Sequence, residues 1–448
     1  RRTARVGIIP PACPGVTTRE ERHAANPQMS RSFLLRLPPG LVALRERNFV
    51  LYVIGQFTSR LGDWIELTAV SWILYELTNS PLALGLSGFF RAVPLLVLGL
   101  FGGAIADRVP RRPLMLFTES TMLVVSLTVG LLAATGELRF WHFYILNLVS
   151  GTLSAFSVPA RQALFAGLVP HSSIQSAVTL NSFAVRSGAF IGPTIAGLTL
   201  AFGNYAVPFF LNAVSFLGLL VALIAMRLPP SKREKVPQPL VHGVSEGLGF
   251  VWRSAPIKVV LGLELLAGLF GYNSTLITII ARDILGTGPE GLGLLLSATG
   301  AGGLAAMMLM MAFHIRRHAR VVLIVGGLYA VLWAAAALSP WLLLSAALFF
   351  ALGATDGIWT IARNTLAQLL VHDAMRGRVM SIVMLVVRGS SDAGRVQAGL
   401  LVDLVGVVAA VLAGATVIGA GVLRSWRVPL PEYATPQIAP AADAPAKL

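Results

Sequence analysis

Cysteine and charged residues are scarce in this 448-residue chain. It has one cysteine, Cys13, which excludes an intramolecular disulfide framework and a cysteine-based metal cluster. Charged residues make up only 12% of the chain, whereas hydrophobic residues make up 55%. A soluble chain of this length does not bury so much apolar surface in ordinary domains. The composition therefore predicts an integral membrane protein.

Signals for nucleotide or nucleic-acid binding are also missing. The sequence has no Gly-Lys-Ser/Thr phosphate loop, so ATP is not expected to be the direct energy source. The glycines of Gly286–Gly291 have dinucleotide-type spacing, but they follow no strand and join two apolar segments. The net charge of +15 comes from short basic groups between apolar segments and not from one soluble face. We therefore expect no nucleic-acid partner, no cofactor, no metal and no enzymatic activity.

An internal repeat organises the rest of the sequence. Residues of Ala160–Gly203 recur in the second half of the chain with the same spacing and without insertions. Matched positions include Ala160 and Ala362, Arg161 and Arg363, Arg186 and Arg388, and Gly197 and Gly399. A second register matches Pro81 with Pro289 and Gly85 with Gly293. Duplicated halves of apolar helices, with a substrate site between them, are typical of secondary transporters.

Apolar stretches of about 20 residues predict roughly twelve transmembrane helices. We place them near residues 49–77, 82–106, 113–135, 140–163, 175–201, 205–227, 257–281, 290–313, 321–338, 340–366, 379–402 and 404–424. Basic residues gather in every second connection, at Arg108, Arg111, Arg112, Arg227 to Lys258, Arg316, Arg317, Arg320, Arg376 and Arg378. Because Lys and Arg are enriched in cytoplasmic loops, both termini are predicted to be cytoplasmic, as an even number of helices requires.

Composition divides the chain into five predicted parts. They are a cytoplasmic tail (1–47), a first six-helix bundle (48–227), a cytoplasmic linker (228–256), a second six-helix bundle (257–424) and a cytoplasmic tail (425–448). The first 28 residues lack an initiating methionine, since Met29 is the first. They are either a genuine tail or an upstream extension of the reading frame, and we give them no function.

The connection between the second and third predicted helices carries the sequence GGAIADRVPRR, residues 102–112. It resembles the loop between helices 2 and 3 of the major facilitator superfamily. Glycines let a helix end approach its neighbours, an aspartate can lie against a helix N-terminus, and arginines can anchor a cytoplasmic face. The resemblance implies that Asp107 latches onto the start of the eleventh helix, near Arg378, in the outward-facing state. It implies a cytoplasmic gate formed by Gly103, Asp107, Arg108, Arg111 and Arg112; a plain basic loop is the alternative.

Further motifs resemble a bacterial branch that includes enterobactin exporters and macrolide efflux proteins. They are Leu61 to Asp63, Tyr75 to Ser80, Pro159 to Leu164, Leu168 to Pro170 and Arg376 to Ser381. In the fifth predicted helix, a group of small residues resembles the glycine-proline motif of antiporters and is expected to act as a hinge: Gly188, Gly192, Pro193 and Gly197. Small residues allow close helix approach and Pro193 interrupts the backbone ladder, although ordinary helix packing is the alternative.

Polar residues line one face of several predicted helices. In the first helix, the residues Tyr52, Gln56, Ser59, Arg60, Asp63 and Glu66 fall within an arc of about 120° at ~100° per residue. Similar faces carry Asn147, Gly151, Ser154 and Arg161 in the fourth helix, Glu264, Gly268, Gly271, Thr275 and Thr278 in the seventh, and Ser345, Gly353, Asp356, Thr360 and Arg363 in the tenth. These helices hold the same position in each three-helix repeat, and the resemblance implies that they line a central cavity.

Charged side chains in such helices need water or a partner. Each would cost about 2.5–3.5 kcal/mol at the bilayer centre, so five together would cost more than ~12 kcal/mol. Our candidates for the cavity or for proton coupling are Gln56, Arg60, Asp63, Glu66, Glu264 and Asp356. Internal ion pairing, as between Arg60 and Asp63, is the alternative. The matched residues Arg186 and Arg388 either bind an anionic substrate group or hold neighbouring helices, and we favour the second role. We expect Arg91 and Glu119 to be packing partners near the bundle edge.

These features predict an all-α membrane protein with twelve transmembrane helices in two pseudo-symmetric six-helix bundles, the major facilitator fold. We expect a multi-pass monomer in the lipid bilayer of the bacterial inner membrane, with a small-molecule substrate. The resemblance implies export of a small amphipathic molecule, such as a siderophore or a drug, in exchange for protons. A proton-coupled importer is one alternative. A non-transporting receptor or scaffold is another, but it would not need polar faces in four helices.

Overall fold

The computed structural model describes residues 39–227, 249, 251–312, 318–371 and 373–428, and these residues are almost entirely helical. The helices of the first half are η2 (Pro39–Arg45), α1 (Arg47–Thr78), α2 (Pro81–Arg108), α3 (Arg111–Ala134), α4 (Phe140–Ala166), η3 (His171–Ser173), α5 (Ile174–Ala201) and α6 (Val207–Ala225). Those of the second half are α8 (Ala255–Phe270), α9 (Ser274–Ile279), the π-helix η4 (Ile280–Ile284), α10 (Pro289–Ala312), α11 (His318–Leu338), α12 (Leu342–Leu370), α13 (Asp373–Val405) and α14 (Val407–Trp426).

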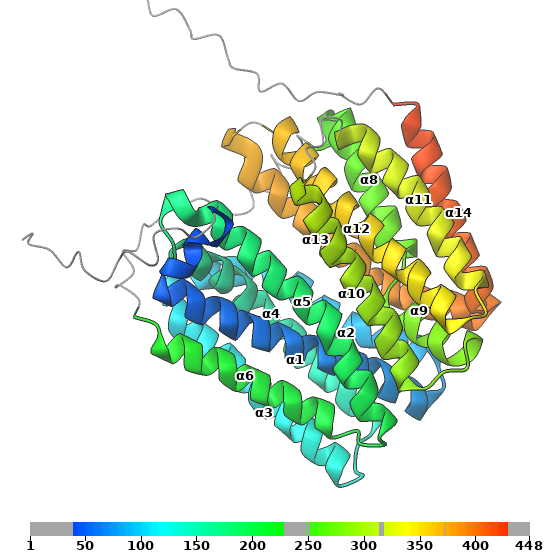
Figure 1. Ribbon diagram of the computed structural model, residues 1–448, viewed down its shortest axis with the longest axis horizontal. Helices are drawn as coiled ribbons and strands as arrows, with labels where there is room; N and C mark the ends of the chain where they lie inside the picture. Colours follow the sequence, from blue (N-terminus) through cyan, green and yellow to red (C-terminus); the bar gives the residue numbers. More distant parts are fainter. Residues whose placement is uncertain (1–38, 228–248, 250, 313–317, 372, 429–448) are drawn as a thin grey trace, which may run out of the picture.

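The helices form two bundles that lie side by side (Figure 1). In the first bundle α1 packs against α5 and α6, α2 against α4, and α3 against α4 and α6. In the second bundle α10 packs against α12, α11 against α12 and α14, and α8 against α13 and α14. The bundles meet mainly where α5 crosses α10 and where α2 crosses α13. The all-α fold of two related bundles is therefore as predicted.

Within the described residues, ten helical segments are long and apolar enough to cross a membrane, and the run from Ala255 to Ile284 counts as one of them. Helices α1 and α13 are the longest, with 32 and 33 residues, but they are not among the ten. Both carry several charged residues within their length. The number of twelve membrane spans therefore stays a prediction.

Helix ends follow local backbone signals. Helix α1 ends at Thr78, and the next residue, Asn79, has a left-handed backbone (φ 46°) and donates its N–H to the carbonyl of Tyr75 at 2.8 Å. Gly406, with a φ of 82°, separates α13 from α14, a conformation that glycine adopts without strain. Most predicted helices lie within a few residues of the observed ones. The largest shift of a helix start is at α13, which begins at Asp373 and not near residue 379.

The outer faces of the bundles carry apolar side chains, as α6 illustrates. Val214, Leu217, Val221 and Ile224 follow one face and are between 50% and 63% exposed. Phe216, Leu219 and Leu223 point inward and are almost fully buried. A helix that is apolar on its exposed face as well as its buried face is suited to contact with hydrocarbon.

The repeat in the sequence marks the interface between the bundles. A Cβ atom added to Gly197 would lie 2.7 Å from the carbonyl oxygen of Pro289 and 3.1 Å from the Cα of Gly293. Its repeat partner Gly399 is packed in the same way, 2.5 Å from the carbonyl oxygen of Pro81. The residues that match between the halves are thus the ones that let α5 approach α10, and α13 approach α2, without side chains in between.

Polar contacts also join the bundles at this end. The hydroxyl of Tyr75 donates to Asp283 Oδ2 at 2.5 Å, and Arg282 donates to the Tyr75 carbonyl at 3.1 Å and to Asn79 Oδ1 at 2.8 Å. The guanidinium of Arg282 lies over the Tyr75 ring, 5.1 Å from its centroid. The bundles diverge toward the opposite end, where α1 begins and α14 ends (Figure 1). We call these two ends the closed end and the linker end.

Candidate functional site

A cavity of about 360 Å³ lies between the bundles and is lined mainly by the second one. The first bundle contributes Trp64 and Leu67 from α1 and Arg186 and Ala189 from α5. The polar and aromatic residues from the second bundle include Glu264, Tyr272, Asn273, Tyr329, Asp356, Trp359 and Arg395. We call it the main cavity. Its walls combine both signs of charge with large aromatic rings, which can contact a ligand that is part polar and part apolar.

The seventh predicted helix is broken where it lines the main cavity, so the prediction of one continuous helix over 257–281 was wrong. Helix α8 ends at Phe270, Gly271 is extended, and α9 begins after Asn273, whose side chain caps it by accepting from the Leu276 N–H at 3.0 Å. Glu264 and Thr275 therefore do not share one regular helix face.

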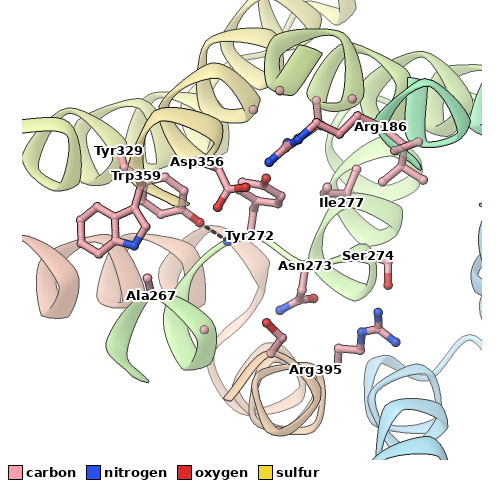
Figure 2. Close-up of a pocket in the computed structure, with 18 of the residues that line it drawn as sticks. Arg186, Ala267, Tyr272, Asn273, Ser274, Ile277, Tyr329, Asp356, Trp359 and Arg395 are labelled. Carbon is pink, nitrogen blue, oxygen red and sulfur yellow. Dashed lines mark hydrogen bonds between the residues drawn. The ribbon is translucent and has the colours of Figure 1, made fainter. Parts of the chain in front are cut away.

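Neighbouring aromatic side chains satisfy the backbone groups that the break leaves free. The Tyr272 N–H donates to the Tyr329 hydroxyl at 2.9 Å (dashed in Figure 2), and the Trp333 indole N–H donates to the Phe270 carbonyl at 3.2 Å. Unwound backbone inside a membrane is tolerated where it is buried in protein or lines a cavity. The π-helix η4 follows soon after, and such irregularities are frequent at functional sites.

Asp356 and Arg186 face each other across the main cavity. Asp356 comes from α12 and lies beside Tyr272, while Arg186 reaches in from α5 (Figure 2). The two charges attract each other, yet Arg186 makes no hydrogen bond or ion pair with any residue that the structure describes. A pair from opposite bundles with space between its members can accept a polar ligand.

Glu264 has a fixed environment in the same cavity. Its carboxylate forms an ion pair with Arg363 and accepts a hydrogen bond from the Trp359 indole N–H at 2.8 Å. Arg363 is only 3% exposed and lies behind Glu264, between α8 and α12. Because a buried arginine needs a partner, loss of the Glu264 charge would leave Arg363 unpaired.

A second, smaller cavity of about 80 Å³ lies in the first bundle, at its contact with α13. Arg60 pairs with Asp63 at 2.9 Å, as the alternative of internal pairing expected, and Arg161 pairs with Glu119 at 2.7 Å. Arg91 and Arg388 also line it. We had expected Arg91 and Glu119 to be packing partners near the bundle edge. Instead both line this cavity, and the Glu119 carboxylate is paired with Arg161. We call this space the arginine cavity.

The polar face of α1 does not line one surface. Gln56 is 2% exposed, donates to the Tyr52 hydroxyl at 2.9 Å and accepts from Arg161 at 3.0 Å, so it supports the arginine cavity from behind. Glu66 points into the first bundle, where Ser126 and Asn212 donate to its carboxylate at 2.7 and 2.6 Å. Glu66 lines neither cavity.

The predicted gate is described only in part. Gly103, Asp107 and Arg108 lie within α2, but their side chains, like that of Arg378, are outside the described residues. Arg111 donates to the Ala163 carbonyl at 2.9 Å, and Arg112 donates to the Ile224 carbonyl at 2.7 Å. Both arginines therefore bind carbonyls at the ends of α4 and α6, within their own bundle.

The glycines of the predicted hinge are sites of close packing. A Cβ on Gly188 would lie 3.1 Å from the backbone of Arg60, and one on Gly192 would lie 2.7 Å from the Trp64 Cβ. Gly197 contacts the other bundle, and the carbonyl oxygen of Pro193 would lie 2.6 Å from a Cβ on Gly293. Gly188 and Gly192 thus seat α5 on α1, while Gly197 and Pro193 seat it on α10. Their role as a hinge stays a prediction.

Several cavity residues were not among the predicted site residues: Trp64, Tyr272, Asn273, Tyr329, Trp359 and Arg395. A signal for two of them is present in the sequence. Gly271-Tyr272-Asn273-Ser274 combines a helix-ending glycine with two helix-capping residues. Read in this way, the motif would have predicted the break. The aromatic residues sit in apolar segments and carry no such signal.

A family comparison agrees with this architecture. The model of the transmembrane secretion effector family matches residues 39–448. This chain belongs to that family of major facilitator transporters. The fold class is thus confirmed, and the protein is a multi-pass membrane transporter of small molecules and not an enzyme.

Characterised and uncharacterised transporters are among its relatives. The chain is 28% identical to the MFS-type transporter YfiS of Bacillus subtilis, over 81% of this chain and 88% of that protein. It is 25% identical to the multidrug efflux pump Tap of Mycolicibacterium fortuitum, over 81% of this chain and 91% of the pump. It is 29% identical to the enterobactin exporter EntS of Shigella flexneri, over 50% of this chain and 53% of the exporter.

Solved structures share the fold at low identity. The nucleoside transporter NupG superposes with a TM-score of 0.65 at 12% identity, over 85% of this chain and all of that one. This similarity concerns the fold alone, because identity at this level carries no information on substrates.

Proposed function

We propose that this protein is a secondary active exporter that moves a small amphipathic molecule, such as a siderophore or a drug, by alternating access in exchange for protons. The observation that carries the proposal is the main cavity, in which the Arg186–Asp356 pair spans the two bundles beside Trp64, Trp359 and Tyr272. A charge pair can orient a polar group while the rings contact an apolar body. The efflux relatives Tap and EntS support export over import.

We assign the coupling proton first to Asp356. A coupling carboxylate must reach the substrate and must be able to lose its charge without leaving a buried cation unpaired. Glu264 and Asp63 have arginine partners at contact distance, and Glu66 reaches neither cavity. Asp356 lines the main cavity and has no such partner among the described residues. The charged and titratable groups around it are Glu264, Arg186, Arg363, Tyr272 and Tyr329.

The orientation in the membrane is part of the proposal. We place residues 1–47, 228–256 and 425–448 in the cytoplasm. In this orientation the linker end is cytoplasmic, and the bundles diverge toward the side from which an exporter takes its substrate. The protein acts as a monomer in the inner membrane. Labelling of single cysteines at Ser80 and Ser231 from opposite sides of the membrane tests this orientation.

Transport in inside-out membrane vesicles tests the function. Enterobactin and ethidium serve as probes, because one is an anionic siderophore and the other a cationic drug. Uptake of at least one probe should require an inside-acid pH gradient, and probe addition should release protons from the vesicles. In Asp356→Asn, uphill uptake should be lost while downhill exchange persists, because substrate contacts can remain without the driving ion.

Two controls separate the alternatives. Asp392→Asn removes a carboxylate on α13 that does not line the main cavity, and it should retain coupling. Uptake driven in the opposite direction would favour an importer, and no flux of any probe would favour a receptor. If Asp356→Asn still exchanges probe for protons as the parent does, the coupling residue lies elsewhere.

A further inference from the structure

The arginine cavity contains more positive charge than its own carboxylates balance. Its lining includes four arginines, on α1, α2, α4 and α13, and two acidic residues, Asp63 and Glu119. Each carboxylate is already engaged, Asp63 by Arg60 and Glu119 by Arg161. Arg91 and Arg388 remain without a hydrogen bond or ion pair to any described residue. These two guanidinium groups come from different bundles and repel each other.

The carboxylate of Asp392 does not compensate for them. Asp392 lies one turn beyond Arg388 on α13 and attracts it, but Asp392 is itself shared with Arg395 at 3.8 Å. Asp392 does not line the arginine cavity. The cavity itself adds hydroxyl groups and not acids, from Thr118, Ser150, Ser154 and Ser157.

The internal repeat shows what is missing here. Asp356 lies seven residues before Arg363 and faces Arg186 in the main cavity. At the matching position, seven residues before Arg161, the first bundle has Ser154. Arg388 is the repeat partner of Arg186, so the duplicated arrangement kept the arginine in the arginine cavity but not its acidic partner.

We propose that the arginine cavity binds a compact oxyanion between Arg91 and Arg388, in the place that Asp356 fills in the main cavity. The planar forks of two arginines match the oxygens of a carboxylate, sulfate or phosphate group. Ser154 and Ser157 can donate further hydrogen bonds to it. The volume of about 80 Å³ is several times the ~10–15 Å³ that one water needs. Arg388 is exposed, so an anion can reach the site from the space between the bundles.

The site has a consequence for the contact between the bundles. Arg91 lies on α2 and Arg388 on α13, two helices that pack closely from Gly85 to Gly88. Without an anion their like charges oppose close approach, whereas an anion bound between them attracts both. Occupancy of the site therefore favours the arrangement in which α2 and α13 lie together.

The oxyanion has two sources. It is either a free inorganic ion or the anionic end of the transported molecule, and only the second source rests on the proposed function. The binding of an inorganic ion can be measured on purified protein without any transport. Failure of the anion site and failure of the exporter function are therefore separate results.

Sulfate is the probe for the first experiment. The full chain is purified in detergent, the ionic strength is held constant with gluconate, and sulfate is titrated by calorimetry and by thermal unfolding. We expect saturable binding of one sulfate and a rise in the unfolding temperature, because a ligand that binds only the folded state stabilises it. Arg91→Gln and Arg388→Gln should each weaken sulfate binding at least tenfold. Arg424→Gln, which removes an exposed charge on α14, should bind as the parent does.

Ser154→Asp is a more specific test, because it places a carboxylate in the arginine cavity at the position that matches Asp356 in the repeat. It should raise the unfolding temperature in the absence of sulfate and abolish the further rise with sulfate. A purely structural role of the arginines would not produce this exchange of one anion for another. No saturable binding to the parent, or equal binding by the parent, Arg388→Gln and Ser154→Asp, would overturn the proposal.

A displacement experiment then identifies the source of the anion. If enterobactin displaces sulfate from the parent protein, the site holds the anionic end of a transported molecule. If sulfate binds and enterobactin does not displace it, the site holds a free inorganic ion. Both results support the anion site, and they differ only in what occupies it during transport.

Discussion

Replacement of Gly197 by alanine should open the closed end. A methyl group at this position would lie 2.7 Å from the Pro289 carbonyl oxygen and 3.1 Å from the Cα atoms of Glu290 and Gly293. All three are backbone atoms of α10, so no side-chain rotation can make room. Overpacking of this kind costs about 1–3 kcal/mol. The cost arises only while α5 and α10 are in contact, so it raises the proportion of the state open at this end by about 5- to 150-fold.

Spin labels on two exposed residues measure this proportion. Phe202, after α5, and Leu343, at the start of α12, belong to different bundles at the closed end and are 86% and 81% exposed. With Cys13 replaced by serine, electron–electron double resonance on cysteines at these two sites reports the separation of the bundles. Gly197→Ala should move population from the shorter to the longer distance.

Matched variants isolate the cause. Gly262→Ala on α8 gains the same helix propensity of about 1 kcal/mol, but a Cβ there would meet nothing within 4 Å. It should leave the distances unchanged. Gly399→Ala, the repeat partner, should open the closed end as Gly197→Ala does, because its methyl group would meet the Pro81 carbonyl at 2.5 Å. If Gly197→Ala and Gly262→Ala give the same distance distribution, close packing of α5 on α10 does not hold this end closed.

Two further predictions concern stability and the gate. Arg363→Gln leaves Glu264 buried without its cation and should lower the free energy of unfolding by about 3–5 kcal/mol, which is measured as a lower unfolding temperature in detergent. Arg363→Gln combined with Glu264→Gln should recover part of this loss. Equal stability of the single and double variants would contradict the pairing. Asp107→Asn should reduce the rate of transport while the amount of protein in the membrane stays the same, because it removes a conformational latch and not a membrane span; unchanged transport would remove Asp107 from the mechanism.

Sequence alone predicted the helices well because the membrane imposes one rule on all of them. Every backbone group in hydrocarbon must be satisfied within a helix, so apolar length and basic flanks are sufficient to place most ends. The failure at Gly271 has a physical reason. The Phe270 carbonyl and the Tyr272 N–H leave the helix only because Trp333 and Tyr329 of α11 supply partners. Those partners are distant in the sequence, so the hydrophobicity of the residues in α8 does not indicate that the helix is broken there.

The partners of the charged residues were the least predictable feature. Helical periodicity correctly placed the polar residues of α1 on one arc, but packing divides that arc among three environments. Asp63 lines the arginine cavity, Gln56 supports that cavity from behind, and Glu66 is enclosed by Ser126 and Asn212. A helix that is surrounded by neighbours has no single wet face. Only the tertiary contacts decide which carboxylate meets water, an arginine or an amide.

The duplicated arginines show how one repeat can produce two different sites. Arg186 leaves the first bundle to enter a cavity formed mostly by the second, and Arg388 leaves the second to enter a cavity formed mostly by the first. Gly197 and Gly399, which allow α5 and α13 to pack closely against the other bundle, are also matched in the repeat. The repeat therefore preserved the contact between the bundles. It did not preserve the residue at the position of the acidic partner, which is Asp356 in the main cavity and the uncharged Ser154 in the arginine cavity. The attraction between charges on opposite bundles is stronger in the arrangement that brings them closer together. Protonation of an acid in one cavity and binding of an anion in the other would therefore both shift the equilibrium between the bundle arrangements. The two cavities are therefore expected to act on one equilibrium between bundle arrangements, and their ligands should alter each other's affinity by the same factor in both directions.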